Sequence, residues 1–345
     1  MPMKRLEYMV RQWAIPAKTL SHLCAQQKIP GAVLADGAWF IPDGAEKPAL
    51  PRPFLKWAGG KGRSLPQISA HYPRFLGGAI TRYAEPFVGG GAVLFDVLSR
   101  YHIEQAYLSD TNPELMNVYR AVKHCVEALI AQLEELGAAY LPLQSEDRRA
   151  FYYEKRRMFN AASPCTAESE PCPGRAALFL FLNRTCFNGL YRVSRGGQFN
   201  VPMGRYKNPQ ICNAPGLRAA SAALSGVQLV CGSYARSAEF IDDKTFVYLD
   251  PPYRPLSKTS SFTAYTKDAF DDDSQRQLAA FFAEMAERGA SLLLSNSDPR
   301  NADPQDDFFD ALYRRFEIHR IPVGRAINAR ADGRGQISEL LIQNY

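Results

Sequence analysis

The clearest hydrophobic pattern in the chain is a short apolar run at residues 245–249, which ends in an acid, two prolines and an aromatic residue. Consecutive apolar residues predict a strand buried on both faces, as in the centre of a parallel sheet. Because Pro251 and Pro252 lack a backbone N–H, the chain leaves the sheet there. Ligands of open α/β sheets bind at the carboxyl ends of strands, so Asp250 and Tyr253 are candidate site residues. An ordinary strand end with a surface acid would give the same short pattern.

A glycine-rich turn between a strand and a helix is the second strong pattern. Residues 83–87 predict a strand, 88–91 a turn and 92–98 a helix. The missing Cβ atoms let a phosphate or nucleoside lie against the backbone. About twenty residues later, a further predicted strand ends in Asp110, where nucleoside-binding folds place a carboxylate for the ribose. Asp110 can equally cap the helix that follows it, and the two roles are compatible.

The remaining pattern separates a sheet from an inserted helical region. It predicts helices at 112–136, 146–160 and 274–288, a buried strand at 291–296, a closing strand pair at 316–323 and 336–343, and loops at 163–174, 257–264 and 325–334. Strands and helices that alternate on both sides of a helical stretch predict an α/β fold. The expected architecture is a doubly wound, Rossmann-like sheet with an inserted, mostly helical domain.

The first 48 residues form a separate pattern. Two short helices are predicted on either side of Pro16, and an Asp-Gly pair inside residues 33–41 predicts a β-hairpin. Together they resemble the small winged-helix domains of the excisionase and MerR type. The resemblance implies an auxiliary DNA-binding unit with Lys18, His22 and Lys28 near phosphates. A docking module without a nucleic-acid role is the alternative. The prolines around residues 49–53 predict a stiff linker.

Composition adds a mild positive charge that is unevenly distributed. The 345 residues contain 41 Lys+Arg and 35 Asp+Glu, a net charge of +6. Residues 171–238 contain no Asp or Glu, and residues 183–200 interleave arginines, amides and aromatic side chains with glycine turns. Such side chains bind phosphates and base edges and stack on bases, so the segment predicts nucleic-acid binding. An acidic protein partner would satisfy the same charge.

Cysteine usage and hydropathy argue against other classes of protein. The seven cysteines are scattered, without a Cys-x-x-Cys pair or histidines at ligand spacing. This predicts reduced thiols, a cytoplasmic protein and no metal site. The N-terminal residues are too polar for a signal peptide, and no stretch is long and apolar enough for a membrane span.

Several short motifs follow one another along the chain. They are Lys56-Trp57-Ala58-Gly59-Gly60-Lys61, Glu85-Pro86-Phe87-Val88-Gly89-Gly90-Gly91, Ser109-Asp110, Asn188-Gly189-Leu190-Tyr191-Arg192, Phe199-Asn200-Val201-Pro202 with Gly204-Arg205-Tyr206-Lys207, and Asp250-Pro251-Pro252-Tyr253. In this order they resemble the motifs of the Dam family (D12 class, alpha group) of DNA adenine-N6 methyltransferases. The resemblance covers about residues 54–343.

The resemblance implies S-adenosylmethionine as methyl donor, double-stranded DNA as partner and a monomer. It implies a catalytic domain at 54–122 and 230–345 and a target-recognition domain at 123–229. The implied catalytic residues are Asp250, Pro251, Pro252 and Tyr253. The implied cofactor-binding residues are Trp57, Lys61, Glu85, Phe87, Gly89, Gly91, Asp110, Ser233, Tyr234 and Asp250, with Ser233 in place of a commoner Asp. The implied DNA-binding residues are Lys56, Asn188, Arg192, Arg195, Pro202 and Tyr206.

The family's usual target implies the adenine of GATC, with Arg192 reading a guanine. The chemistry of adenine fits the same residues. Its N6 is paired inside the duplex and is a poor nucleophile, so the base has to be flipped out. Tyr253 can then stack on the base, while Asp250 and the Pro251 carbonyl can accept hydrogen bonds from the amino group. Positioning of the methyl donor and the acceptor nitrogen supplies much of the remaining rate acceleration, and no covalent enzyme intermediate is needed.

Other reactions fit the sequence less well. Cytosine-C5 methylation needs a nucleophilic cysteine in Pro-Cys-Gln, and Pro164-Cys165 and Pro171-Cys172 lack the glutamine. An Asp before Pro-Pro-Tyr favours adenine over cytosine-N4 or protein glutamine. Two alternatives are a catalytically idle, sequence-specific DNA-binding regulator and a methyltransferase that acts on a protein or small molecule.

Overall fold

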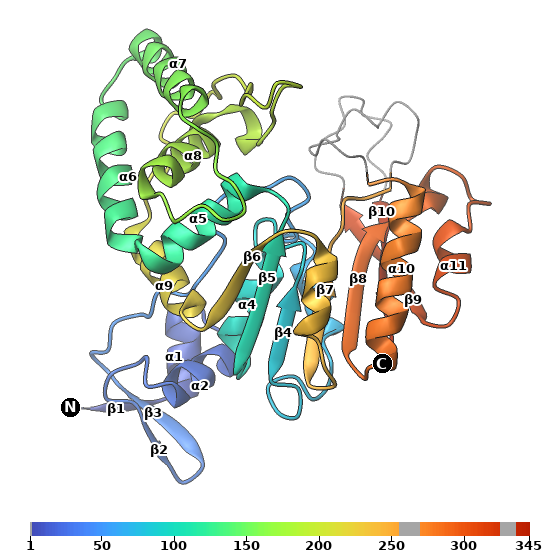
Figure 1. The fold of residues 1–345 in the computed structure, drawn as a ribbon. Helices are drawn as coiled ribbons and strands as arrows, with labels where there is room; N and C mark the ends of the chain where they lie inside the picture. The colour runs from blue at the N-terminus through green and yellow to red at the C-terminus, as the bar shows by residue number, and fades with distance from the viewer. Residues whose placement is uncertain (1, 255–269, 325–335) are drawn as a thin grey trace.

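A seven-stranded sheet forms the centre of the protein (Figure 1). The computed structural model describes residues 2–254, 270–324 and 336–345 and orders the strands β6-β5-β4-β7-β8-β10-β9. The strands from β6 to β8 run parallel, and β10 lies antiparallel between β8 and β9. Their bounds are β4 (Arg82–Glu85), β5 (Gln105–Asp110), β6 (Val227–Cys231), β7 (Thr245–Leu249), β8 (Ser291–Ser297), β9 (Glu317–Gly324) and β10 (Gln336–Gln343). The predicted α/β fold with a Rossmann-like sheet is confirmed, and the predicted loops 257–264 and 325–334 lie outside the described residues.

Both faces of the sheet are covered, because side chains alternate along its strands. Phe246 and Tyr248 of β7 belong to the hydrophobic cluster that includes α4 (Ala92–Arg100) and α5 (Pro113–His124), whereas Val247 and Leu249 belong to the cluster that includes α10 (Asp272–Glu287). β7 is therefore buried at every position and ends at Leu249, one residue before Asp250, as its sequence predicts. The covering helices are α3 (Leu65–Ala70), α4 and α5 on the first face and α10 and α11 (Phe308–Leu312) on the second, with the short 3-10 helices η2 (Tyr234–Glu239) and η4 (Pro299–Asn301) in the connections.

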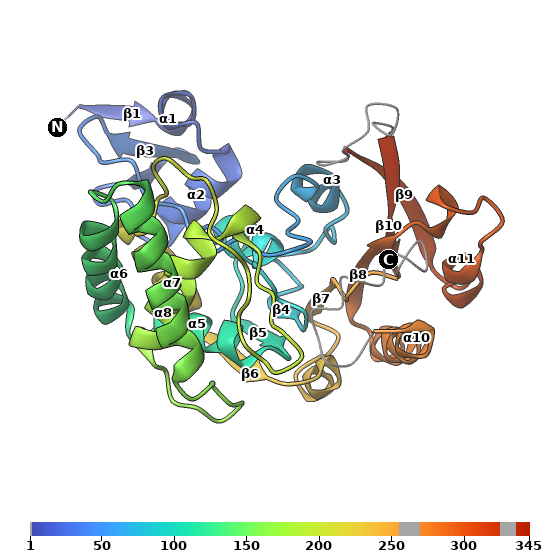
Figure 2. The ribbon, with the colours of Figure 1, turned by 90° about the horizontal axis from the view of Figure 1, so that it is seen from above.

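A group of helices stands at the carboxyl ends of the parallel strands (Figures 1 and 2). It comprises α6 (Val126–Tyr140), α7 (Ser145–Ala161), α8 (Pro173–Thr185) and the 3-10 turn η1 (Phe187–Gly189), while α9 (Ala214–Leu224) packs beside the sheet on α4, α5 and α6. α6 and α7 pack on α8, which is buried on nearly all sides. An all-buried helix lacks the amphipathic period that sequence analysis detects, so α8 was not predicted.

The single helix predicted at 112–136 is wrong. The chain forms α5 and α6 instead, separated at Cys125, whose backbone angles (φ −135°, ψ 34°) are not helical. α5 stays on the sheet against β5 and β6, whereas α6 turns away to pack on α8. The apolar residues of the two helices have the same spacing, so the break depends on which surface each helix covers.

The N-terminal unit has its own hydrophobic cluster, built around Met9, Trp13 and Leu20. The two predicted helices and the hairpin are present, and an additional strand, β1, extends the sheet in the order β1-β3-β2. Its elements are β1 (Met3–Arg5), α1 (Leu6–Trp13), α2 (Ala17–Ala25), β2 (Val33–Ala35) and β3 (Ala38–Pro42). α2 packs against α4, and Lys18 Nζ lies 3.7 Å from the ring centroid of Tyr101.

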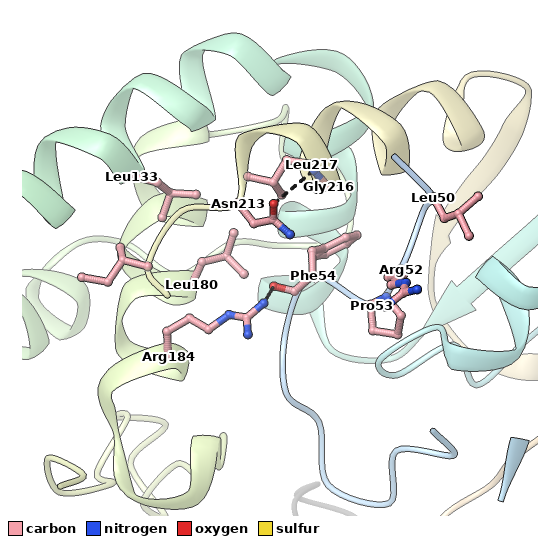
Figure 3. Close-up of a pocket in the computed structure, with 11 residues that line it drawn as sticks. Leu50, Arg52, Pro53, Phe54, Leu133, Leu180, Arg184, Asn213, Gly216 and Leu217 are labelled. Carbon is pink, nitrogen blue, oxygen red and sulfur yellow. Dashed lines mark hydrogen bonds between the residues drawn. The ribbon is translucent and has the colours of Figure 1, made fainter. Parts of the chain in front are cut away.

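The segment that joins this unit to the sheet lines one side of a small cavity of about 60 Å³ (Figure 3). Leu50, Pro53 and Phe54 line it together with residues of α6, α8 and α9. Arg184 Nη2 donates a hydrogen bond of 2.8 Å to the Phe54 carbonyl, which fixes the segment to α8. The cavity shares no residue with the site at Asp250.

Candidate active site

Asp250 follows the carboxyl end of the central strand β7 and is held there by residues from two other segments. Its Oδ1 accepts a hydrogen bond of 2.9 Å from Ser295 Oγ on the neighbouring strand β8. The same oxygen lies 2.8 Å from Nζ of Lys61, which belongs to the loop before α3. Ser295 Oγ is also 3.0 Å from the Tyr248 hydroxyl. The carboxylate at the end of β7 therefore has a fixed orientation.

Tyr253 and Lys61 lie against each other beside this carboxylate. Lys61 Nζ is 4.6 Å from the centroid of the Tyr253 ring and donates a hydrogen bond of 2.8 Å to the Gly59 carbonyl. The Tyr253 hydroxyl donates to Glu339 Oε2 on β10 at 3.1 Å. Glu339 of β10 thus fixes the hydroxyl end of the Tyr253 side chain, and Lys61 lies against its ring.

Burial changes the protonation of the acids around Asp250. Glu85 is buried at the end of β4 and accepts a hydrogen bond of 2.6 Å from the Tyr83 hydroxyl. Burial, with a contribution from the Asp250 charge, raises the pKa of Glu85 to about 8. Burial likewise raises the pKa of Glu339. Glu85 is therefore mostly protonated at neutral pH, which limits the negative charge near Asp250.

Two aromatic side chains, Trp57 and Tyr119, pack against the glycine turn after β4. Gly89 and Gly91 have φ of +46° and +68°, a conformation that favours glycine. A Cβ at Gly89 would lie 2.8 Å from Trp57 Cδ1, and a Cβ at Gly91 would lie 2.6 Å from the Tyr119 hydroxyl. Trp57 also stacks on Tyr191, with ring centroids 5.7 Å apart. The turn thus links the catalytic sheet to the segment that contains the predicted DNA-binding residues.

Asp110 joins this turn to the next loop. Its Oδ2 accepts a hydrogen bond from the Gly89 N–H at 3.2 Å and its Oδ1 one from the Asn112 N–H at 2.9 Å. The alternative role of Asp110 as the cap of the next helix is excluded, because Asn112 caps α5 by accepting from the backbone of Glu114 and Leu115. Burial raises the pKa of Asp110.

Two further predicted cofactor residues meet beside the turn. Phe87 and Tyr234 stack with ring centroids 5.3 Å apart and an interplanar angle of 29°, and both rings are partly exposed. Ser233 is adjacent, but its Oγ caps η2 by accepting from the Ala235 N–H at 3.3 Å. The aromatic pair therefore offers an open apolar surface, while Ser233 already has a structural partner.

The basic segment forms a small hairpin at the edge of the helical group. Val193 and Phe199 pair antiparallel, and Ser194 N–H donates to the Gln198 carbonyl at 2.8 Å. Arg195 lies exposed at the tip. Arg192 is also exposed, and its Nε donates to Asn200 Oδ1 across the hairpin at 2.8 Å. The guanidinium of Arg192 is thus oriented by one bond and has donors left for a ligand.

The other predicted DNA-binding residues converge at the base of this hairpin. Lys56 Nζ donates to the Tyr206 hydroxyl at 3.0 Å, and the side chain of Asn183 bonds to both backbone groups of Lys56. Pro202 accepts a hydrogen bond of 2.8 Å from the Phe187 N–H through its carbonyl. Asn188, in the same turn, has a positive φ of 55°. The structure brings these residues together from two distant parts of the chain.

Comparison with known proteins identifies the family. Residues 57–327 match the family model described as D12 class N6 adenine-specific DNA methyltransferase. The chain belongs to this family. The methyltransferase is 47% identical over 296 residues to the Type II methyltransferase M.MjaIII of Methanocaldococcus jannaschii, with 85% of this chain and 99% of that relative covered. It is 36% identical over 291 residues to the DNA adenine methylase of Escherichia coli K12, with 84% and 94% covered.

A third relative is the Type II methyltransferase M1.LlaDCHI of Lactococcus lactis, which is 36% identical over 301 residues, with 85% of this chain and 95% of the relative covered. The protein is thus an adenine-specific DNA methyltransferase. The range matched by the family model begins at residue 57. The winged-helix resemblance of the N-terminal unit therefore stays a prediction.

The structure adds residues to the methyltransferase site that the sequence did not single out. Ser295 and Glu339 contact Asp250 and Tyr253, and Gln275 donates a hydrogen bond of 3.1 Å to the Pro252 carbonyl. A usable sequence feature existed only for Ser295, because the apolar strand predicted at 291–296 ends in the polar residues Ser295 and Asn296, much as Asp250 directly follows β7. Glu339 lies in the middle of a strand, where local pattern predicts no role.

The described residues contain no group of three or more potential metal-ligating side chains. All seven cysteines lie within the described ranges and are free thiols. No helix in the described part of the methyltransferase is long and apolar enough to cross a membrane.

Proposed function

We propose that the protein transfers a methyl group from S-adenosylmethionine to N6 of an adenine that is flipped out of double-stranded DNA, within GATC. The main support for this proposal is that an oriented carboxylate, Asp250, and an aromatic ring, Tyr253, follow the carboxyl end of β7 together. A carboxylate accepts hydrogen bonds from an amino group, and an aromatic ring stacks on a base.

The residues around the glycine turn fit S-adenosylmethionine. Each carboxylate oxygen of Asp110 accepts one backbone N–H, which leaves lone pairs for two ribose hydroxyls. The partly exposed rings of Phe87 and Tyr234 provide apolar surface for a purine. Trp57 and the Gly89–Gly91 turn would hold the same ligand from the other side. When bound, the cofactor supplies an electrophilic methyl group.

The protein's own residues would prepare the adenine for attack. In the proposed complex, Asp250 Oδ2 and the Pro251 carbonyl accept the two amino hydrogens, which favours a pyramidal nitrogen with its lone pair directed at the methyl group. Among the described residues neither acceptor has a hydrogen-bond partner, whereas the Pro252 carbonyl is taken by Gln275. Within residues 2–254, 270–324 and 336–345, the acceptors without a partner are therefore the two that the proposed reaction needs.

The hairpin and its base provide the DNA contacts in this proposal. Arg192 and Arg195 are exposed on it, and basic side chains of this kind bind guanine edges or phosphates. Phe187, which sequence analysis did not select, is 52% exposed beside Asn188. An exposed aromatic side chain can fill the space that a flipped base leaves in the stack. The proposed division is a recognition domain at 123–229 and a catalytic domain at 54–122 and 230–345, joined to the N-terminal unit by the linker 49–53.

Sequencing of methylated adenines in plasmid DNA tests the proposal. Cells that express the wild type should carry N6-methyladenine in GATC sites. The Arg192→Ala variant should relax the requirement at one guanine by about tenfold or more, because a good arginine–guanine contact contributes about 1–3 kcal/mol of discrimination.

Arg218→Ala is the matched control, because Arg218 belongs to the same acid-free segment but pairs with Glu127 on the surface. Its methylation contexts should equal those of the wild type. Methylated adenines without a GAT-containing context in the wild type would refute the assigned specificity. DNA binding without any methyl transfer would favour the alternative of a catalytically idle regulator.

For the N-terminal unit we propose docking rather than DNA binding. α2, which would enter the groove in a winged-helix domain, packs against α4, and Lys18 stacks on Tyr101. Burial, with a contribution from Arg100, lowers the pKa of Lys18. His22 is partly buried. Lys18 is exposed but contacts Tyr101 at the end of α4, so it lies at the rim of the surface that α2 presents to α4.

Lys18→Glu separates the two roles. A lysine bound to phosphate would contribute about one unit to the slope of log affinity against log salt, whereas a docked lysine contributes nothing. We expect an unchanged slope and a loss of about 1 kcal/mol of unfolding free energy from the lost cation–π contact. DNA titrations at several salt concentrations and urea unfolding provide the two measurements. Lys47→Glu, at an exposed lysine of the same unit, is the control, and a reduced slope for Lys18→Glu alone would contradict docking.

A further inference from the structure

We propose that Gln275 and Asn296 are positioning residues: their side chains form a buried amide pair that holds the backbone on both sides of Tyr253 and so presets the ring that stacks on the extruded adenine. The inference rests on the proposed function. It follows from three features of the described residues, namely the burial of the two amides, their hydrogen bonds to the loop after β7, and their place at the end of an otherwise apolar interface.

The amide pair lies where the apolar packing of α10 against β8 would be expected to continue (Figure 1). Gln275 lies on the buried stripe of α10, three and four residues before Leu278 and Ala279. Asn296 lies two residues after Leu294 on β8 and therefore on the same face of the sheet. Both amide side chains are 0% exposed. Because a buried polar group costs free energy unless it is hydrogen-bonded, packing alone would favour apolar side chains at both positions.

The two amides bind each other and the loop that carries Tyr253. Asn296 Nδ2 donates to Gln275 Oε1 at 3.1 Å. Gln275 Nε2 donates to the Pro252 carbonyl at 3.1 Å, and Asn296 Oδ1 accepts from the Arg254 N–H at 3.2 Å. The pair thus spans Tyr253, with one hydrogen bond to the residue before it and one to the residue after it. An amide that rotated would lose the bond to its partner as well as the bond to the loop.

Arg254 has further contacts, which differ in their exposure to water. Ser297 Oγ donates to the Arg254 carbonyl at 2.9 Å. The guanidinium of Arg254 pairs with Asp272 at 2.7 Å and Asp306 at 2.6 Å, and these acids are 42% and 26% exposed. Solvent screens partly exposed ion pairs, whereas the amide pair is shielded from water. The amide pair is therefore the part of this support that holds the loop most firmly.

The consequence is a Tyr253 side chain that is held at both ends. Its hydroxyl donates to Glu339 Oε2 at 3.1 Å, while the amide pair holds its backbone. A ring that is ordered in advance adds no ordering cost when the adenine arrives. If the loop could shift, the stacked adenine would move relative to Asp250 and the methyl group, and a misplacement of about 1 Å can lower a rate about 10²-fold.

Gln275→Met and Asn296→Leu test the pair by replacing one amide at a time with an apolar side chain of similar size. Single-turnover methyl transfer is measured at saturating DNA and S-adenosylmethionine, on a duplex that the wild type methylates. We expect each variant to lose about 10- to 100-fold in this rate, because positioning in the transition state is lost. The Kd values for DNA and for S-adenosylmethionine should stay within about threefold of the wild type, because the binding contacts remain.

The double variant tests whether the two amides act as one unit. Gln275→Met combined with Asn296→Leu should be no more than about threefold slower than the slower single variant, because residues that act together do not contribute independently. Losses that multiply in the double variant would show two separate roles and would overturn the proposed pair.

Asn117→Leu is the matched control for the loss of a buried amide that bonds to the backbone. Asn117 is 1% exposed, accepts from the Cys172 N–H at 2.8 Å and donates to the Cys172 carbonyl at 3.3 Å. This contact joins α5 to the start of α8 rather than to the loop after β7. The control should unfold at a lower urea concentration than the wild type and keep the wild-type transfer rate. An equal loss of rate in the control would show that the loss of any buried amide slows the enzyme, which overturns the proposal.

The remaining outcomes are distinguishable. If Gln275→Met and Asn296→Leu are destabilised in urea but transfer at the wild-type rate, their role is purely structural and the proposal fails. A raised Kd for DNA with an unchanged rate at saturation contradicts it as well. The two single variants allow the comparison to survive the misfolding of one, which circular dichroism detects. Failure of the wild type to methylate adenine in DNA would instead refute the proposed function, independently of the amide variants.

Discussion

Asp250→Ala lowers the rate of methyl transfer by about 10²- to 10³-fold, because it removes the acceptor that orients the adenine amino group in the transition state. Single-turnover transfer of a labelled methyl group to a GATC duplex measures this rate without interference from product release. DNA affinity should remain close to that of the wild type, because Asp250 lies at the end of β7 and the predicted DNA contacts lie on the hairpin and its base.

Asp43→Ala is the matched control, because Asp43 is an exposed acid of the N-terminal unit. Its transfer rate should equal that of the wild type. Circular dichroism shows whether Asp250→Ala is folded, and the Lys61 ammonium keeps its bond to the Gly59 carbonyl in this variant. A loss of less than about tenfold would mean that another group orients the adenine.

Glu114→Ala destabilises the protein by about 3–5 kcal/mol, because it leaves a buried arginine without its partner. Glu114 at the start of α5 pairs with Arg175 at the start of α8, with Nη2–Oε1 at 2.7 Å and Nε–Oε2 at 2.8 Å. The two side chains are 7% and 9% exposed. Glu114 Oε1 also accepts a hydrogen bond from the Cys165 N–H at 3.0 Å. The pair joins the sheet to the helical group, and urea unfolding measures its loss.

Two further variants test whether the unpaired buried charge causes this destabilisation. Glu127→Ala breaks the exposed pair with Arg218 and should change unfolding little, because solvent screens exposed pairs. Glu114→Ala combined with Arg175→Met removes both charges and should recover much of the loss. Equal destabilisation by the single and double variants would show that packing, and not the buried charge, dominates.

The sequence predicted most accurately those features that depend on neighbouring residues. The prolines after Asp250 end β7 whatever surrounds it, and the glycines at 89 and 91 adopt the positive φ that their turn requires. The sequence predicted less accurately those features that depend on contacts with residues distant in the chain. The helix predicted at 112–136 breaks at Cys125 because its halves cover different surfaces, and Asn112 takes the capping role that was one alternative for Asp110.

By itself, the sequence thus determined the α/β fold, the strand that carries Asp250 and the order of motifs that resembles an adenine-specific DNA methyltransferase. Only the tertiary structure decided which side chains surround the carboxylate. Ser295 and Glu339 reach Asp250 and Tyr253 because β7 lies beside β8, and β8 beside β10, whereas Lys61 reaches Asp250 from the loop before α3. Strand order depends on packing over the whole chain, and local periodicity does not encode it. The contacts of Ser295 and Glu339 with the site therefore became visible only once the strands were in place.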